Sequence, residues 1–336
     1  MRRRNLLALT GLAAVSPAAL TTPAAAADGM GHTAVRPEDI EQIHAASRTL
    51  AEWDNLYGGG IVREVAGGQL ERARSLLQLP CPPRLHAELH TAVGRLAIVM
   101  GASLFDSFWH DEARDLFDLG TWCAENAGNW HLRAAALNWR ARQAIWIGAP
   151  DEGLTHAQNG LIRSDRLTPR EQAMLHNAGA RAWARMGDRQ ECLAAVGRSD
   201  DAFASATNDQ DEAWMAYYDA AQHHGDTGHA LFDIALQSGH PAVGAEGRLQ
   251  TAIHGHTSSY VRSRALSGTK LATLMMATGD PAQAVAVGNR ALDEVGRLRS
   301  KRAIADVQAL RQASDPYRRY PEVIALRERI TATVKQ

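Results

Sequence analysis

The sequence has few of the features that would define a sheet, a disulfide framework or a strongly basic surface. Aromatic residues make up 6% of the 336 residues and no alternating β-branched run stands out, which favours an all-α fold. The three cysteines, Cys81, Cys123 and Cys192, are widely spaced and odd in number. They predict reduced core thiols rather than a disulfide framework or a zinc site. A net charge of −1 argues against a uniformly basic nucleic-acid-binding protein.

Motifs for catalysis and cofactor binding are also missing. The serines after Gly255 do not form a G-x-S-x-G elbow, and no Walker or dinucleotide pattern is present. His86 and His90 flank Glu88, and His223, His224 and His229 cluster farther on, but no spacing specifies a third zinc ligand. An exposed histidine pair is the favoured interpretation of the first two. The sequence therefore predicts a non-enzymatic protein with no cofactor and no metal.

A repeated pattern of helix, turn and helix is the strongest signal in the chain. The pairs Gly187-Asp188, Gly225-Asp226 and Gly279-Asp280 each have a small residue five positions after the glycine. Gly148 followed by Gly153 is a looser copy, and Ala113 marks a further second helix. These small residues, at positions 113, 153, 192, 230 and 284, are separated by 40, 39, 38 and 54 positions. Such a period predicts an α-solenoid.

The small residues have a steric explanation. The second helix of such a hairpin crosses the first closely, so only a small side chain fits at the crossing, while the glycine ends the first helix in a left-handed conformation. The aspartate then caps the next helix. When the units are aligned by these markers, the same position of the first helix holds a small residue in four of them: Gly101, Ala141, Ala180 and Ala272. In the remaining unit Tyr218 takes that position.

The pattern resembles the tetratricopeptide repeat, with units several residues longer than the simple repeat of about 34. The resemblance predicts an all-α, tetratricopeptide-like α-solenoid of helical hairpins with capping helices. Two leading helices are expected over residues 37–80, the repeat array over 81–297 and capping helices over 298–336. The interval of 54 leaves room for an additional short helix over about 241–255. The triple glycine at 58–60 is expected to be a flexible turn between the leading helices.

Residues 1–36 allow two interpretations. Arg3-Arg4, the apolar run after them and the Ala-rich stretch before Asp28 have the layout of a twin-arginine export signal. The apolar run is too short to span a membrane as a permanent helix. The alternative, which we favour, is a linker segment in a cytoplasmic protein.

Four stretches are similar to a large group of actinobacterial regulators, in which a helix-turn-helix domain of the Xre type precedes a tetratricopeptide array. They are Arg3–Ala14, WDNLYGGGIVREV at 53–65, SSYVRSRAL at 258–266 and DPYRRYPEVIALRERI at 315–330. The resemblance implies a role in transcriptional regulation. Because no residues precede Met1 to form the DNA-binding domain, no direct nucleic-acid binding is expected from this chain alone.

A candidate binding patch follows from comparing the units. Asn138 and Arg142 occupy the same repeat positions as Asn177 and Arg181, and Asp219 and Gln222 lie at or near the corresponding face of the next unit. First helices line the concave side of a solenoid, so these side chains are expected to form a patch in an open groove. Amides bind peptide backbone and arginines bind carboxylates, which suits an extended peptide. A solvated face without a ligand is the alternative.

These observations predict a regulatory or scaffold protein that binds a peptide or protein segment in its groove. The resemblance extends to peptide-sensing regulators of Gram-positive bacteria, which bind peptides in repeat grooves. An exported repeat protein for protein–protein interaction is the alternative function. The sequence leaves open whether the chain forms a homodimer.

Overall fold

The structure is a computed structural model that describes residues 33–207, 211–238 and 244–335. Across these residues the chain forms α-helices and short 3₁₀ helices and no strand. The all-α prediction is therefore confirmed. The helices are α2 (Pro37–Tyr57), α3 (Gly59–Leu76), α4 (Pro83–Asp106), α5 (His110–Ala127), α6 (Trp130–Trp146), α7 (Pro150–Leu161), α8 (Pro169–Met186), α9 (Arg189–Ala204), α10 (Ala220–Ser238), α11 (Ala245–Gly255), α12 (Val261–Thr278), α13 (Pro281–Val295), α14 (Lys301–Ala313) and α15 (Pro321–Val334).

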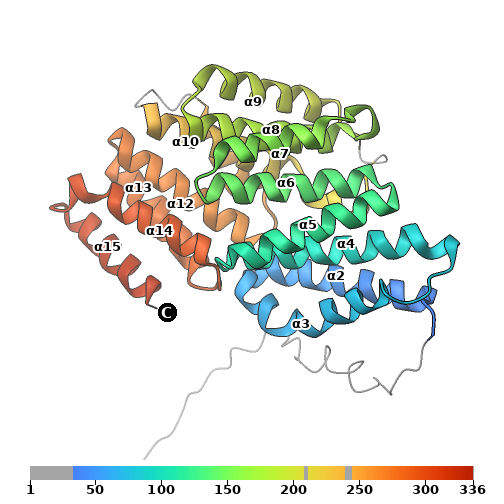
Figure 1. Ribbon diagram of the computed structural model, residues 1–336. Coiled ribbons are helices and arrows are strands. Elements are labelled where there is room, and N and C mark those ends of the chain that lie inside the picture. Colours follow the sequence, from blue (N-terminus) through green and yellow to red (C-terminus); the bar gives the residue numbers. More distant parts are fainter. Residues whose placement is uncertain (1–32, 208–210, 239–243, 336) are drawn as a thin grey trace, which may run out of the picture.

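Consecutive helices pack in pairs, as expected for a solenoid of hairpins. The strongest packing joins α4 to α5, α6 to α7, α8 to α9, α10 to α11 and α12 to α13. The last hairpin continues the stack, because α14 packs on α12 and α15 packs on α13 (Figure 1). The tetratricopeptide-like architecture predicted from the repeat is thus the observed one.

Two of the Gly-Asp pairs turn the chain as predicted. Gly187 ends α8 with φ 83°, and the Asp188 side chain accepts a hydrogen bond from the Glu191 amide at 3.0 Å. Gly279 and Asp280 do the same between α12 and α13, with φ 99° at the glycine. Because only glycine adopts this left-handed conformation without strain, the glycine fixes where the first helix ends.

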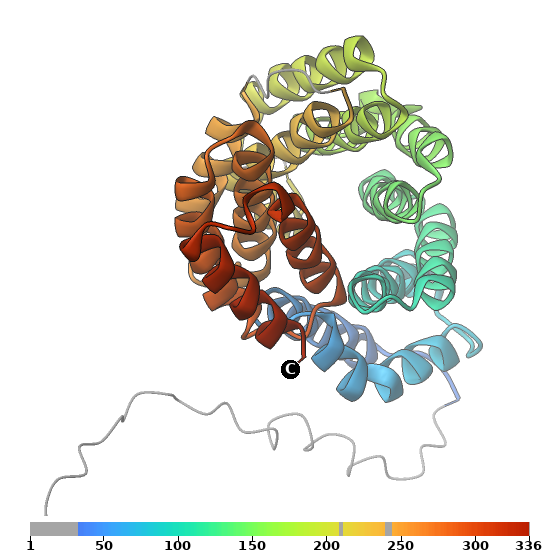
Figure 2. The ribbon, with the colours of Figure 1, turned by 90° about the vertical axis from the view of Figure 1, so that its left-hand side faces the viewer.

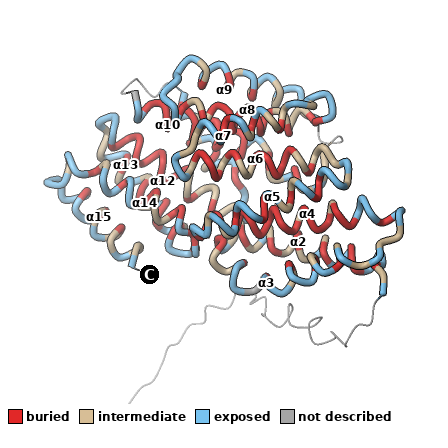
Figure 3. The backbone as a smooth tube through the Cα atoms, viewed as in Figure 1, coloured by how far each residue is buried: buried red, intermediate tan, exposed pale blue. Residues whose placement is uncertain are grey.

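Small residues lie where the two helices of a hairpin cross. Ala113, Cys192 and Ala284 in the second helices are fully buried, and so are Ala141, Ala180 and Ala272 in the first helices. At Gly101 an added Cβ would meet the Phe117 ring at 2.6 Å. Figure 3 shows that the buried positions follow the faces on which the helices pack. The predicted steric role of these residues is confirmed.

Gly153 offers a test of this packing. A Cβ at Gly153 would lie 2.6 Å from Ile145 Cγ1 and 3.0 Å from the Ala141 carbonyl oxygen. We expect Gly153→Ala to lower the free energy of unfolding by about 1–3 kcal/mol through overpacking. Gly197 is the matched control, since an added Cβ there meets nothing within 4 Å. Gly197→Ala should instead stabilise helix α9 by about 0.5–1 kcal/mol. Urea denaturation of both variants checks the prediction, and equal effects would contradict it.

The prediction of a turn at Gly225-Asp226 is wrong. Helix α10 runs through both residues without a break, and its hairpin partner is α11. Ala230 therefore lies in a first helix, and the segment expected to be an additional helix is the second helix of this hairpin. The extra length lies before α10, where a 3₁₀ helix, η2 (Ala213–Tyr217), joins α9 to α10.

The triple glycine is a close contact rather than a flexible turn. Gly58, with φ 84°, alone separates α2 from α3. The Gly59 amide donates a hydrogen bond to Asp106 Oδ2 at 3.0 Å, and a Cβ at Gly59 would lie 2.1 Å from the Ser103 carbonyl oxygen. The Gly60 amide donates to the Arg299 carbonyl oxygen at 3.0 Å. The glycines thus let the backbones of three distant segments approach one another.

These contacts close the solenoid into a ring. Besides Gly60, Tyr57 also reaches the C-terminal part of the chain, since its carbonyl oxygen accepts from the Arg299 amide at 2.8 Å. Arg302 and Ser300 at the start of α14 both bind Asp106 at the end of α4, each at 2.9 Å. Figure 2 shows the first hairpin beside the last helices, around a central space. The open groove expected from the sequence is a closed ring.

The remaining expectations concern the N-terminus and the cysteines. Residues 1–32, which carry the export-signal and linker interpretations, lie outside the described residues. Cys123 and Cys192 are fully buried free thiols, and burial raises the pKa of each to about 12. No helix in the described part of the chain has the length and apolar character needed to cross a membrane.

Candidate functional site

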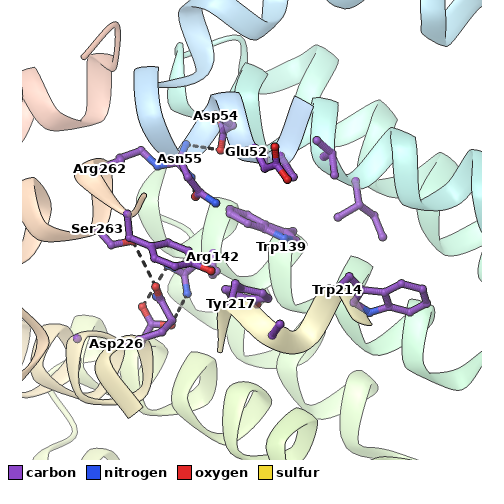
Figure 4. Close-up of a pocket in the computed structure, with 18 of the residues that line it drawn as sticks. Glu52, Asp54, Asn55, Trp139, Arg142, Trp214, Tyr217, Asp226, Arg262 and Ser263 are labelled. Atoms are coloured by element: carbon purple, nitrogen blue, oxygen red, sulfur yellow. Dashed lines mark hydrogen bonds and ion pairs between the residues drawn. The ribbon is translucent and has the colours of Figure 1, made fainter. Parts of the chain in front are cut away.

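The ring surrounds a partly open cavity of about 610 Å³. Its walls come from elements distributed around the whole ring, namely α2, α4, α6, η2, α10, α12 and the start of α14. Figure 4 shows Glu52, Asn55, Trp139 and Tyr217 converging on this space from α2, α6 and η2. The volume falls within the range of about 300–1,000 Å³ that is usual for ligand sites.

An ion pair between Arg142 on α6 and Asp226 on α10 forms one side of the cavity. The two guanidinium nitrogens lie 2.8 and 3.3 Å from the two carboxylate oxygens (Figure 4). Burial alone would raise the pKa of Asp226, but Arg142 holds it below its usual value. Both side chains are therefore charged and mutually neutralised, and they join α6 to α10, two helices that pack on α8.

A second charged group lies where the ring closes. Arg262 on α12 forms an ion pair with Asp54 on α2, and its other nitrogen lies 3.5 Å from Asn55 Oδ1. Arg262 also approaches Asp106 to 4.0 Å. Asp54 accepts a further hydrogen bond from Ser103 Oγ at 3.0 Å. The cavity wall and the ring closure thus share residues.

Aromatic side chains form the apolar part of the wall. Trp139 projects from α6, while Trp214 and Tyr217 come from η2. The Tyr217 hydroxyl donates to Met174 Sδ at 3.1 Å, and burial raises the pKa of Tyr217 to about 12. These rings offer flat apolar surface beside the charged groups, which is a common arrangement in ligand sites.

Two of the six residues predicted from the repeat, Arg142 and Gln222, line the cavity. Asn138 and Asn177 are buried, at 1% and 3% exposure, and do not line it. Arg181 lies outside the lining and forms an ion pair with Asp233 at 2.9 Å.

Asp219, the sixth predicted residue, is also outside the lining and has a structural role. Its side chain accepts a hydrogen bond from the backbone N–H of Gln222 at 2.9 Å, at the start of α10. The Gln222 side chain in turn accepts from Ser263 Oγ at 3.3 Å. The predicted two-by-two patch therefore does not form one surface of the cavity, because only one of its four members reaches it.

Several lining residues were missed by sequence reasoning. They are Asp54, Asn55, Arg95, Trp214, Tyr217, Arg262 and Ser263. A signal existed for most of them. Asp54 and Asn55 lie in the stretch 53–65 and Arg262 and Ser263 in 258–266, two stretches from which we inferred a family resemblance. Tyr217 precedes Tyr218, the residue at which the repeat pattern fails.

The histidines contribute to packing more than to any metal site. His90 is buried at 6% exposure and its Nδ1 lies 2.9 Å from the His86 carbonyl oxygen, so the expected exposed pair is only half exposed. His223 binds Asp200 at 2.8 Å, while His229 lines the cavity. Over the described residues, no group of three or more histidine, cysteine or acidic side chains has the arrangement of a metal site.

Comparison with known proteins identifies the fold but no family. No protein-family model matches the sequence, and no curated protein matches it significantly. Among solved structures, the ring is similar to a Rap protein crystallised in complex with competence and sporulation factor. The TM-score is 0.51 at 12% sequence identity, over 88% of this chain and 98% of the Rap chain. At this identity the similarity establishes a shared tetratricopeptide-like fold, and the function has to be argued from the site.

Proposed function

We propose that this protein is a non-enzymatic regulatory protein that binds a short peptide in the central cavity of its ring. The observation that carries the proposal is the partly open cavity of about 610 Å³ inside the ring, whose walls combine aromatic, amide and charged side chains. A cavity of this volume holds a short segment rather than a folded domain. The wider interpretation, binding of a whole protein in an open groove, is less compatible with a closed ring.

The chemistry of the wall suits a peptide. Asn55 and Gln222 present side-chain amides, which bind backbone N–H and C=O groups alike. Trp139, Trp214 and Tyr217 offer surfaces for apolar side chains. The same combination of amides and rings serves other peptide-binding proteins.

The similar Rap structure supports this proposal. That protein was crystallised with competence and sporulation factor, and the two chains share a fold over most of their lengths. If this chain binds a peptide inside its ring, a regulatory role follows from the position of the cavity. Asn55 and Arg262 belong to both the cavity wall and the ring closure, so a bound ligand would contact both sides of the closure.

A hydrolytic function is less well supported. Ser267 Oγ lies 3.4 Å from His229 Nε2, and both residues line the cavity. A serine nucleophile needs a histidine that accepts a proton. Burial lowers the pKa of His229 well below its usual value, and four nearby cations lower it further: Lys270, Arg181, Arg142 and Arg302. The surroundings therefore oppose the imidazolium that such a reaction forms.

The proposal is tested by filling the cavity. Ala216 lines it from η2 and is exposed, so Ala216→Trp adds bulk to the cavity without entering the packed core. Purified protein is mixed with synthetic hexapeptides of randomised sequence, bound and free peptides are separated by gel filtration, and retained peptides are identified by mass spectrometry. We expect wild type to retain a defined subset and Ala216→Trp to retain at least about 10-fold less.

Ala282→Trp is the matched control, because Ala282 is exposed on α13 and does not line the cavity. It should retain peptides as wild type does, and circular dichroism should show the same helicity for all three proteins. If wild type retains no peptide, or if Ala216→Trp retains as much as wild type, peptide binding in the cavity is wrong.

A further inference from the structure

The arginines that line the cavity differ in how their charges are compensated. Three of them are paired: Arg142 with Asp226, Arg262 with Asp54 and Arg302 with Asp106. Arg48 has an exposed side chain on α2, where water solvates the charge. Arg95 is the remaining one, and it lies on α4 in a partly buried position.

Arg95 has no hydrogen bond or ion pair to any described residue. A guanidinium has five N–H donors, and a buried one is normally paired with a carboxylate. The guanidinium carbon of Arg95 lies 5.7 Å from the centroid of the Trp214 ring. That separation is near the outer limit for a cation–π interaction and satisfies none of the donors. Burial lowers the pKa of Arg95 to about 10, so the side chain is still charged at neutral pH.

Trp214 gives a second, independent indication that an acceptor is missing here. Its indole nitrogen is buried and has no hydrogen-bond partner within the described part of the chain. Buried donors are rarely left unpaired in native proteins. Arg95 on α4 and Trp214 on η2, two neighbouring side chains of the cavity wall, thus each carry a donor that has no acceptor among the described residues.

We infer that Arg95, beside Trp214, is the anchor for a peptide carboxylate inside the ring. This inference rests on the proposed function and names the chemical group that the cavity selects. A carboxylate matches the planar guanidinium through two parallel N–H···O bonds, and desolvation in the cavity strengthens them. The carboxylate comes either from the C-terminus of the peptide or from an aspartate or glutamate side chain.

The test compares two preparations of the same randomised hexapeptides, one with free C-terminal acids and one with C-terminal amides. Each is offered to wild type, Arg95→Gln and Arg95→Lys, and retained peptides are quantified by mass spectrometry. Wild type should retain the free acids at least about 10-fold better than the amides, since a hydrogen-bonded ion pair is lost in the amides. Arg95→Gln should remove this preference, while Arg95→Lys should keep part of it. Retention of amides rich in aspartate or glutamate would assign the carboxylate to a side chain.

Arg290→Gln is the matched control, because Arg290 is exposed on α13 and does not line the cavity. Arg95→Gln removes a charge without a described partner, so its melting temperature should be at or above that of wild type. The anchor is wrong if wild type retains acids and amides equally without enrichment of acidic residues, or if Arg95→Gln keeps the wild-type preference. If these results occur while Ala216→Trp still loses peptides that wild type retains, the proposed peptide binding in the cavity remains supported. Wild type retaining no peptide would contradict both proposals.

Discussion

Replacing Asp106 with alanine is expected to lower the free energy of unfolding by about 3–5 kcal/mol, the usual cost of removing one member of a buried ion pair. Asp106 is fully buried at the end of α4. Its carboxylate accepts hydrogen bonds from the Gly59 amide at 3.0 Å, from Ser300 Oγ at 2.9 Å and from Arg302 Nε at 2.9 Å. Alanine would leave these donors, one of them cationic, buried without their acceptor.

The charges at this position explain why the effect should be large. Burial alone would raise the pKa of Asp106, but Arg302 and Arg262, with the hydrogen bonds from Gly59 and Ser300, hold it below its usual value. The ionised carboxylate therefore joins the first hairpin, α4 and α14 across the ring closure. Its removal should weaken the closure as well as the overall stability.

Guanidinium denaturation measures the stability change, and small-angle X-ray scattering measures whether the radius of gyration rises as the ring opens. Asp165→Ala is the matched control, because Asp165 is 60% exposed and its pair with Arg163 lies at the surface. Water screens the charges of exposed pairs, so the control should stay near wild type. Equal losses in the two variants would show that Asp106 does not hold the ring closed.

The second large effect is expected from acid. Seven histidines are held with a lowered pKa, in each case first by burial: His90, His110, His176, His223, His224, His229 and His256. Each is harder to protonate in the folded protein than in the unfolded chain, where histidine takes up a proton near pH 6.5. The unfolded state thus binds more protons as the pH falls through 6.5, and the folded state loses stability. We expect the free energy of unfolding to fall between pH 7 and pH 5.

One histidine acts in the opposite direction. The hydrogen bond that His131 Nδ1 donates to the Glu171 carboxylate raises the pKa of His131. Its contribution to stability is therefore fully present below about pH 6.5 and is lost as the pH rises through the folded-state pKa. The seven histidines with a lowered pKa outnumber it, so the free energy of unfolding should decrease as the pH falls.

Urea denaturation at pH 7 and pH 5 measures how the free energy of unfolding changes with pH. The variant His229→Gln tests whether His229 contributes strongly to that change. The variant should lose less stability on acidification than wild type does. His254→Gln is the control, since this side chain is exposed on α11. A protein that is as stable at pH 5 as at pH 7 would contradict the prediction, as would equal slopes for His229→Gln and wild type.

The repeat in the sequence predicted the hairpins because its causes are local. A left-handed glycine, a capping aspartate and a small residue five positions on specify a turn and a close crossing within one unit, as at Gly187 and Gly279. The same Gly-Asp pair at Gly225-Asp226 led to the wrong prediction of a turn. There the Asp226 carboxylate binds Arg142 from 84 positions away instead of capping a helix, and the chain stays helical.

The candidate site was predicted less well than the fold. Arg142 and Gln222 line the cavity. Asn177 and Arg181, which occupy the repeat positions of Asn138 and Arg142 in the next unit, instead bind Tyr218 and Asp233. Equivalent positions in a repeat share a helix face, yet their partners come from neighbouring units that differ. The pairing of each arginine was therefore decided by the assembled ring.

The sequence alone determined an all-α chain of stacked hairpins, since helix periodicity, turns and small residues at crossings act over fewer than about 40 residues. Only the tertiary structure decided that the stack closes, with Asp54 and Asp106 reaching Arg262 and Arg302, and that Arg95 lies partly buried at the cavity wall without a carboxylate partner among the described residues. Closure depends on the sum of small rotations between successive hairpins, and no single unit encodes that sum.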